Sequence, residues 1–234
     1  MYKRPMLRHE LTFPKKSFLG KINQDSWDLL SSRWKTQVYK PGQFLINAQD
    51  TSGDVFFVLR GSAKATIYTD SGKEVSFIHV ATGDCFGEFA AIDDHPRSAS
   101  VVASEECLAA RLDKPNYIAL MQSHSDMCFA LLQILIGHLR TLSKRVVDFN
   151  SKNADQRLHE ALLDLAEKHK RSDSDNVLIH RPPTQAELAA FIFSSRESVA
   201  REMGRMRKLG LLDRQRRSLE VPSIEKLRGF VAAN

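Results

Sequence analysis

The sequence predicts an α+β protein that contains a strand-rich N-terminal part, one long helix and a C-terminal winged helix-turn-helix. Three observations lead to this fold class. Short apolar and β-branched runs separated by turn signals fill residues 36–112, which is typical of a sandwich or barrel. A heptad pattern then covers residues 128–149. Two short segments with helix-capping signals follow after residue 183.

The strand-rich part begins after a helical lead-in over residues 17–33. Its clearest strands are residues 55–59 and 74–78, because both combine β-branched and aromatic side chains. The turn signals between the strands are Pro41-Gly42, Ser52-Gly53-Asp54, Arg60-Gly61, Asp70-Ser71-Gly72 and Thr82-Gly83-Asp84.

The composition is that of an ordinary globular protein. The 234 residues are 42% hydrophobic and carry a net charge of +6. No apolar run is long enough to cross a membrane, and no secretory signal is visible, so a cytoplasmic location without membrane contact is expected. Cys85, Cys107 and Cys128 form neither a disulfide framework nor a zinc pattern. We expect all three to be small buried hydrophobic residues, and we expect no metal.

The heptad stripe predicts a long helix over residues 124–150. Its apolar residues step by four and three positions: Cys128, Leu132, Leu135, Leu139, Leu142, Val146 and Phe149. A stripe this narrow favours a two-stranded coiled coil between two copies of the chain. Packing against the chain's own strands, or a combination of both, remains open. Polar residues at 150–153 interrupt the pattern, so we expect a domain boundary and a hinge there.

The C-terminal segment carries two signals for a helix start. Thr184-Gln185-Ala186-Glu187 has the form of a capping box and follows two prolines. Ser194-Ser195-Arg196-Glu197 repeats the signal ten residues later. Two capped helices with a tight connection indicate a helix-turn-helix, and residues 214–221 are expected to form a β-hairpin wing with Arg216-Arg217 at its tip. An ordinary helical hairpin is the alternative.

Positive charge is concentrated in this segment. Residues 191–217 contain eight Lys or Arg against three acids, and such a field attracts phosphate backbones, although a solvated basic face has the same composition. The first turns of a recognition helix enter the major groove, where Arg pairs with guanine and Glu accepts from cytosine. The predicted contacts with double-stranded DNA are Thr184, Gln185, Ser195, Arg196, Glu197, Ser198, Arg201 and Arg216.

A second candidate site is formed by residues 86–91 and 96–101. Gly87 permits close backbone approach to a ligand, and a helical turn that starts there directs N–H groups at an anion. Arg97 offers a planar fork for two phosphate oxygens, and Ser98 adds a donor. The carboxylate of Glu88 suits a ribose hydroxyl. The alternative is a structural ion pair between Glu88 and Arg97.

These motifs together resemble the Crp/Fnr superfamily of transcription regulators, over about residues 17–221. Residues 86–101 resemble the phosphate-binding cassette of cyclic-nucleotide-binding domains, and Ser195-Arg196-Glu197 resembles the family's recognition helix. The resemblance implies a jelly-roll-like double-stranded β-roll that binds a cyclic nucleotide over residues 17–123, a dimerisation helix over 124–150 and a DNA-binding domain over 154–234.

The resemblance also implies a role for each site residue. Glu88 would bind the ribose 2′-hydroxyl, and Gly87, Arg97 and Ser98 would bind the cyclic phosphate of cAMP and/or cGMP. Other residues expected at this site are Phe86, Phe89, Ala99, Thr141, Leu142 and Ser143, with Phe77 and Val80 as further apolar walls. The implied partners are a second copy of the chain, near-palindromic DNA with TGTGA-like half-sites, and RNA polymerase.

The sequence departs from the family pattern at a few positions. Leu142 stands where the cAMP-binding members have a base-contacting threonine, and the loop between Glu88 and Arg97 is one residue shorter. Phe193 replaces the glycine of the turn before the recognition helix. A regulator that is constitutive or answers to another effector, and a nucleotide-binding module that acts on a protein partner, are therefore alternatives. We expect no enzymatic activity, because no nucleophile–base set and no Walker loop is present.

Overall fold

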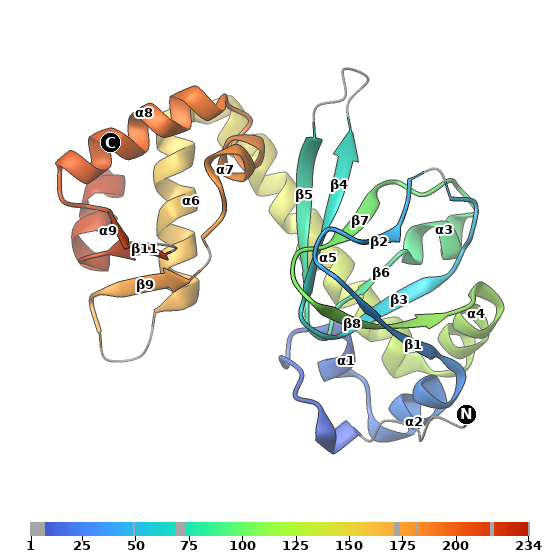
Figure 1. Ribbon diagram of the computed structural model, residues 1–234. Helices are drawn as coiled ribbons and strands as arrows, with labels where there is room; N and C mark the ends of the chain where they lie inside the picture. The colour runs from blue at the N-terminus through green and yellow to red at the C-terminus, as the bar shows by residue number, and fades with distance from the viewer. Residues whose placement is uncertain are drawn as a thin grey trace. The chain divides into compact units, whose positions relative to one another are not determined.

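We describe the protein from a computed structural model (Figure 1). It describes residues 8–48, 50–68, 74–170, 174–180, 182–215 and 218–233, and the side chains at 67, 68, 74–78 and 145 are also left out. The chain divides into two compact units, Met1–Arg140 and Thr141–Asn234. The division therefore falls inside the long helix, ten residues before the boundary that the sequence predicts.

The N-terminal unit contains two four-stranded antiparallel sheets, which agrees with the predicted sandwich. The first sheet has the order β1 (Lys35–Tyr39), β8 (Cys107–Leu112), β3 (Val55–Arg60) and β6 (Cys85–Phe86). The second has the order β2 (Phe44–Ile46), β7 (Ser100–Ala103), β4 (Ser62–Tyr68) and β5 (Glu74–Ala81). A hydrophobic core that includes Tyr39, Phe56, Val80, Val101 and Ala109 contains residues of both sheets. Alternating side chains of facing sheets produce such a core.

Helices of the same unit pack on the first sheet. They are α1 (Phe18–Lys21), α2 (Gln24–Arg33), α4 (Lys114–Ser123) and the start of α5 (Ser125–Ser151), and a short 3₁₀ helix over Arg8–Glu10 precedes them. The lead-in that the sequence predicts as one helical segment is two helices. The break occurs because the side chain of Asn23 accepts a hydrogen bond from the Ser26 N–H at 2.8 Å and so begins a new helix.

The two faces of helix α5 differ in how far they are buried. Met127, Ala130 and Leu131 are buried in the core of the N-terminal unit. The heptad stripe remains largely exposed, with 64% of Leu139 and 61% of Val146 accessible, whereas Leu135 packs against the core. One part of the helix thus covers its own domain while the stripe is left free. The expectation that all three cysteines are buried is confirmed for Cys107, whereas Cys85 is half-buried and Cys128 lies exposed on this stripe.

The C-terminal unit packs short helices and a small sheet around one core. Its elements after α5 are α6 (Ala154–His169), β9 (Val177–His180), α7 (Gln185–Phe191), α8 (Arg196–Lys208), β10 (Asp213–Gln215), β11 (Ser218–Val221) and α9 (Ile224–Ala233). The strands pair antiparallel in the order β10-β11-β9. Leu162, Leu188, Val199 and Leu227 belong to the core. The pair α7 and α8 with the β10–β11 hairpin is the predicted winged helix-turn-helix, and its tip, Arg216-Arg217, lies outside the described residues.

Local capping chemistry explains where these two helices begin. Thr184 and Glu187 form the reciprocal capping box that the sequence predicts for α7. The prediction for α8 is wrong by one residue: the cap is Ser195, whose hydroxyl accepts from the Ser198 N–H at 3.1 Å, and no Glu completes a box. The turn shifts because Phe193 takes a left-handed conformation with φ of 53°, which reverses the chain just before the cap.

Among the described helices, none is by itself long and apolar enough to cross a membrane, and only α4 and α5 taken together, bent by 102°, have the required length and composition.

Candidate functional site

The end of β6 and the start of α3 (Glu88–Asp93) form the first candidate site. Gly87 caps this short helix in the left-handed region, with φ of 86°. A Cβ atom at this position would lie 2.7 Å from Arg97 Nη1 and 2.9 Å from the carbonyl oxygen of Asp54. Both the backbone angle and the lack of space therefore require glycine, as predicted from the sequence. Gly87 has no side chain to cap α3, so the N–H groups of its first turn after that of Glu88, which interacts with the Glu88 carboxylate, can face a ligand.

Arg97 lies beneath this turn and is the most deeply placed charge of the site. Its side chain is 6% exposed. Nη1 donates to the carbonyl oxygen of Gly87 at 2.9 Å, and Nη2 donates to the carbonyl oxygen of Asp54 at 2.7 Å and to the Ser52 hydroxyl at 3.2 Å. The Nε–H is buried and has no hydrogen-bond partner in the described part of the chain. A buried guanidinium with an unused donor is costly, and an anion would relieve that cost.

Glu88 lies close to Arg97 but does not pair with it. The described residues show no ion pair between the two side chains, so the structural-pair alternative finds no support. Burial raises the pKa of Glu88, and its own backbone N–H and the positive charge of Arg97 lower it in part. Burial also lowers the pKa of Arg97, against the opposing effect of the Asp54 carboxylate. The neighbouring opposite charges therefore offset only part of the cost of burying the charged forms of Glu88 and Arg97.

The remaining predicted residues of this site differ in accessibility. Ser98 is exposed and Ala99 is half-buried next to it. Phe86 is buried and stacks on Phe56 with ring centroids 5.3 Å apart, whereas Phe89 is 50% exposed. Val80 is buried in the sheet core, and the side chain of Phe77 lies outside the described residues. Thr141, Leu142 and Ser143 are exposed residues of α5 in the other unit, and their part in ligand binding stays a prediction.

Sequence reasoning missed Ser52 and the carbonyl group of Asp54 at this site. In the sequence, Ser52-Gly53-Asp54 indicates only a turn between strands. Nothing in its residue types indicates that it orients an arginine 43 positions further along the chain. The contact arises from the tertiary structure, because the start of β3 and the loop after α3 meet there.

The second candidate site is the N-terminal half of α8. Arg196, Glu197 and Arg201 are exposed, while Val199, Glu202 and Met206 are buried against the core. The spacing of three and four residues places the two sets on opposite faces of one helix. Ser195 and Ser198 lie at the cap, and Thr184 and Gln185 begin α7. The side chains of Arg196, Glu197 and Arg201, which are predicted to read DNA bases, are therefore accessible.

A buried polar pair holds the inner face of α8, and nothing in the residue pattern indicates it. His159 of α6 and Glu202 are both nearly inaccessible, and His159 Nε2 lies 2.6 Å from Glu202 Oε1. Arg205 Nε and Nη2 also donate to the Glu202 carboxylate, at 2.8 and 2.7 Å. The hydrogen bond from Arg205 lowers the pKa of Glu202 and keeps it ionised. These buried contacts hold the inner face of α8 against α6, while the outer face of α8 remains accessible.

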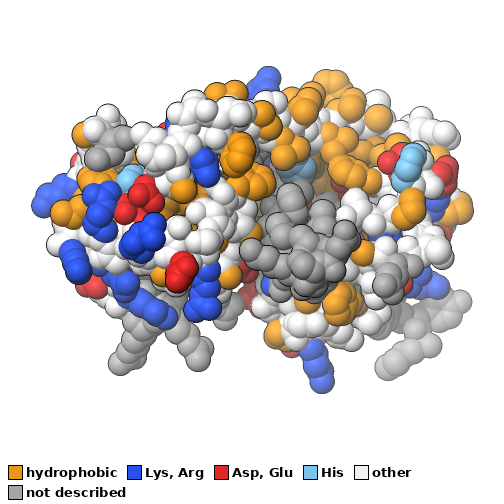
Figure 2. Space-filling model, turned by 90° about the horizontal axis from the view of Figure 1, so that it is seen from above, with side chains coloured by type: hydrophobic (Ala, Val, Ile, Leu, Met, Phe, Trp, Pro, Cys, Tyr) orange, Lys and Arg blue, Asp and Glu red, His pale blue; other side chains and the backbone are white. Residues whose placement is uncertain are grey.

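Figure 2 shows Lys and Arg side chains gathered over the C-terminal unit, with few acids among them. This matches the charge excess of residues 191–217. The described residues contain no group of three or more His, Cys, Asp or Glu that could hold a metal ion.

Comparison with known families identifies a domain in each half of the chain. Residues 36–124 match the cyclic nucleotide-binding domain family, and residues 156–230 match the Crp-like helix-turn-helix domain family. The first range contains Gly87, Glu88 and Arg97, and the second contains all of α7 and α8. The two matches account for the predicted fold class and domain order.

Known proteins resemble this chain over most of its length. The cAMP-activated global transcriptional regulator Vfr of Pseudomonas aeruginosa is 27% identical over 190 residues, which cover 79% of this chain and 88% of Vfr. A structure of a CooA mutant from Carboxydothermus hydrogenoformans has a TM-score of 0.75 at 20% identity and covers 94% of this chain and 97% of that one. The c-di-GMP-responsive regulator CLP of Xanthomonas campestris has a TM-score of 0.74 at 17% identity and covers 85% and 99%. The two structures support the fold alone.

The fold and the two sites define a transcription regulator that binds a cyclic nucleotide in one domain and DNA in the other. The chain belongs to the Crp/Fnr superfamily. Its relatives are regulators rather than enzymes, in agreement with the predicted absence of catalysis.

Proposed function

We propose that this regulator is a homodimer that binds near-palindromic DNA in response to cAMP and/or cGMP. The observation that carries the proposal is Arg97, a buried guanidinium with an unused Nε–H beside the uncapped start of α3. A cyclic phosphodiester supplies the negative charge and the acceptors that this arrangement lacks. The partly compensated carboxylate of Glu88 is suited to accept a hydrogen bond from a ribose hydroxyl.

The other residues of the first site are proposed to have the following roles. Ser98 is an accessible donor for the same phosphate, while Gly87 leaves the space that the ligand needs. Phe86, Phe89 and Ala99 supply apolar surface near the sugar and base. Thr141, Leu142 and Ser143 of α5 are proposed to contact the base. Because Leu142 cannot donate a hydrogen bond, the proposal does not choose between adenine and guanine.

At the second site, Arg196, Glu197 and Arg201 are proposed to contact base edges in half-sites related to TGTGA. Ser195, Ser198, Thr184 and Gln185 are proposed to bind phosphate or sugar, with Arg216 on the phosphate backbone. The exposed heptad stripe of α5 is proposed as the dimer seam. Two recognition helices about 34 Å apart would then meet successive major grooves of the target. RNA polymerase as a partner and a cytoplasmic location complete the proposal.

The decisive experiment is calorimetry with cAMP and cGMP in parallel, followed by titration of a TGTGA-containing duplex with and without each nucleotide. We expect saturable binding of at least one nucleotide and tighter DNA binding in its presence. A ligand shifts the equilibrium only by its differential affinity for the two forms of the protein. Nucleotide binding without any change in DNA affinity would contradict the proposed coupling.

A regulator that is constitutive or answers to another effector is the second candidate. It is favoured by the hydrogen bonds that Arg97 already makes to two backbone carbonyl groups and to Ser52. CLP, a neighbour in fold, is described as responsive to c-di-GMP. DNA binding that is equal in all arms of the titration would favour this candidate. The third alternative, a module that acts on a protein partner, is disfavoured by the helix-turn-helix family match, and a salt-dependent gel shift tests it directly.

A further inference from the structure

Helix α8 carries one acid on its buried face, and the proposed DNA contacts do not use it. Glu202 is 4% exposed and lies between Val199 and Met206, which are buried apolar residues of the same face. Apolar contacts are not directional, so they allow a helix to rotate slightly. Hydrogen bonds define a distance and an angle, and they weaken steeply outside a narrow range. Glu202 is therefore the residue of this face that can fix the rotation of α8 about its own axis.

The partner of Glu202 on the neighbouring helix α6 is His159. The His159 side chain is 2% exposed, and its Nε2 lies 2.6 Å from Glu202 Oε1. The hydrogen bond from Arg205 holds the pKa of Glu202 below its usual range. The ionised carboxylate can only accept hydrogen bonds, so His159 Nε2 carries the proton and donates it. His159 Nδ1 is buried and has no hydrogen-bond partner among the described residues, so the bond to Glu202 sets the orientation of the ring.

Arg205 and Phe230 close this cluster on the side of α9. Arg205 Nε and Nη2 donate to the Glu202 carboxylate at 2.8 and 2.7 Å. The Arg205 guanidinium lies 5.4 Å from the ring centre of Phe230, and the Phe230 ring meets the His159 ring edge-on at 4.9 Å. Arg205 belongs to the basic stretch 191–217, yet these contacts direct its charge toward the protein and not toward a phosphate. Helices α6, α8 and α9 thus meet at one polar cluster.

The cluster lies behind the side chains that are proposed to contact DNA bases. Glu202 directly follows Arg201, which is exposed on the outer face of α8 together with Arg196. Because α8 turns as one body, a rotation that displaces Glu202 displaces Arg201 and Arg196 by the same angle. Bidentate pairing of Arg with a base depends on a fixed fork geometry. Loss of the bond at Glu202 would therefore misalign the base-contacting side chains without removing any of them.

We propose that Glu202 and His159 are positioning residues that set the rotation of α8 and so determine how strongly the protein discriminates between DNA sequences. The proposal rests on the proposed base contacts of α8. It assigns no phosphate contact to Arg205, because that side chain is paired with Glu202. Compared with apolar residues of similar size, a buried polar pair often contributes little net stability, so a defined helix orientation is the gain expected here.

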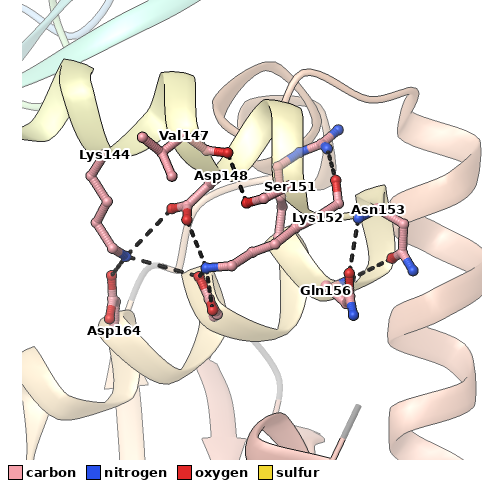
Figure 3. A network of polar contacts seen from close by, with 10 residues as sticks. Lys144, Val147, Asp148, Ser151, Lys152, Asn153, Gln156 and Asp164 are labelled. Carbon is pink, nitrogen blue, oxygen red and sulfur yellow. Dashed lines mark hydrogen bonds and ion pairs between the residues drawn. The ribbon is translucent and has the colours of Figure 1, made fainter.

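A matched set of full-length variants separates helix orientation from stability. In His159→Leu/Glu202→Met, apolar side chains of similar size replace the pair, a change that is often neutral for stability. His159→Gln keeps an N–H donor for Glu202. The control Asp164→Asn removes a carboxylate elsewhere on α6, where Asp164 is 58% exposed and lies 4.0 Å from Lys144 Nζ (Figure 3). Thermal unfolding identifies the temperature at which each variant is folded.

The orientation of α8 is measured without nucleotide or DNA, so this result does not depend on base contacts. Residual dipolar couplings of the amides of α6 and α8, recorded on deuterated full-length protein, report the direction and the rotation of α8 relative to α6. We expect one orientation for the wild type, His159→Gln and Asp164→Asn, and altered or averaged α8 couplings for His159→Leu/Glu202→Met. Unaltered couplings in the folded double variant would overturn the proposal.

Sequence discrimination is measured by gel shifts with a TGTGA-containing duplex and a duplex with scrambled half-sites. We expect the ratio of the two Kd values to fall roughly tenfold in the double variant, because one aligned bidentate contact contributes a factor of about that size. The ratio should be kept in His159→Gln and in Asp164→Asn. A ratio that stays at the wild-type value in the folded double variant would overturn the proposal. A wild type without any sequence preference would instead refute the proposed base contacts, and the couplings would still decide whether the pair sets the rotation of α8.

Arg205→Met provides a test that does not require the double variant to fold. The Arg205 side chain is 49% exposed, so its replacement leaves the core of the unit filled. We expect the salt dependence of DNA binding to stay at the wild-type slope, because Arg205 is assigned no phosphate contact. A slope reduced by about one would identify such a contact and contradict the proposal.

Discussion

Replacement of Arg97 by alanine tests whether the buried guanidinium binds the phosphate of the nucleotide. Since Arg97 is 6% exposed, its interaction with a phosphate is poorly screened by water. Truncating one partner of such a charge pair costs about 2–5 kcal/mol. We therefore expect Arg97→Ala to raise the Kd for a cyclic nucleotide by roughly 30-fold to 4,000-fold, since each 1.4 kcal/mol is about tenfold.

The same substitution also affects the free protein. It removes the donors for the carbonyl oxygens of Gly87 and Asp54. A buried polar group left unsatisfied costs about 1–3 kcal/mol, so the N-terminal unit should be less stable. Thermal unfolding without ligand must therefore show that the variant is folded at the temperature of the binding assay.

Isothermal titration calorimetry with cAMP and cGMP measures the effect, and Arg111→Ala is the matched control. Arg111 is also next to Asp54, but it pairs with the carboxylate and its side chain is 57% exposed. A surface pair is worth about 0–1 kcal/mol, so the control should bind nearly as the wild type does. An unchanged Kd in Arg97→Ala, with the protein folded, would refute the phosphate-binding role.

Three further predictions concern Glu88, α8 and α5. Burial raises the pKa of Glu88 above its ordinary value of 4.5, so the folded state binds this proton more tightly and stability falls as the pH rises from 4.5 through the raised pKa. Glu88→Gln should therefore flatten the dependence of stability on pH, measured by denaturation with the fluorescence of Trp27 and Trp34. An identical slope in the variant would exclude the Glu88 carboxyl group as its source. Arg196→Ala should weaken specific DNA binding by about 1–3 kcal/mol and relax one base position, whereas equal weakening on all sequences in a gel-shift series would make it a phosphate contact. Leu139→Asp places a charge on the exposed stripe and should convert a dimer to a monomer in sedimentation velocity, and an unaltered dimer would place the seam elsewhere.

The features predicted correctly from the sequence depend on local chemistry. Glycine and aspartate at the turns and β-branched runs between them define strands without reference to distant residues. The capping box at Thr184 requires only a hydroxyl and a glutamate three positions apart. Gly87 was identified because its neighbours suggested a tight ligand-binding turn, and its φ of 86° agrees.

The incorrect or missing predictions concern choices between equivalent local signals or contacts between distant residues. Ser194 and Ser195 are chemically alike, and the left-handed turn at Phe193 decides which of them caps α8. The heptad pattern cannot reveal which stripe residues face the chain's own domain, so the exposure of Cys128 and the partial burial of Leu135 were not foreseen. His159 and Glu202 lie 43 residues apart, and neither has a distinctive neighbourhood in the sequence.

The sequence by itself determined the order of the domains and the residue types of the two candidate sites, because turn, capping and charge signals are short-range. Only the tertiary structure decided how deeply Arg97 is buried and which carbonyl groups it binds, since these depend on segments that meet after folding. It also decided that Lys152, in the link between α5 and α6, pairs with Glu160 on α6, because these residues are eight positions apart and their side chains become neighbours only when the chain folds.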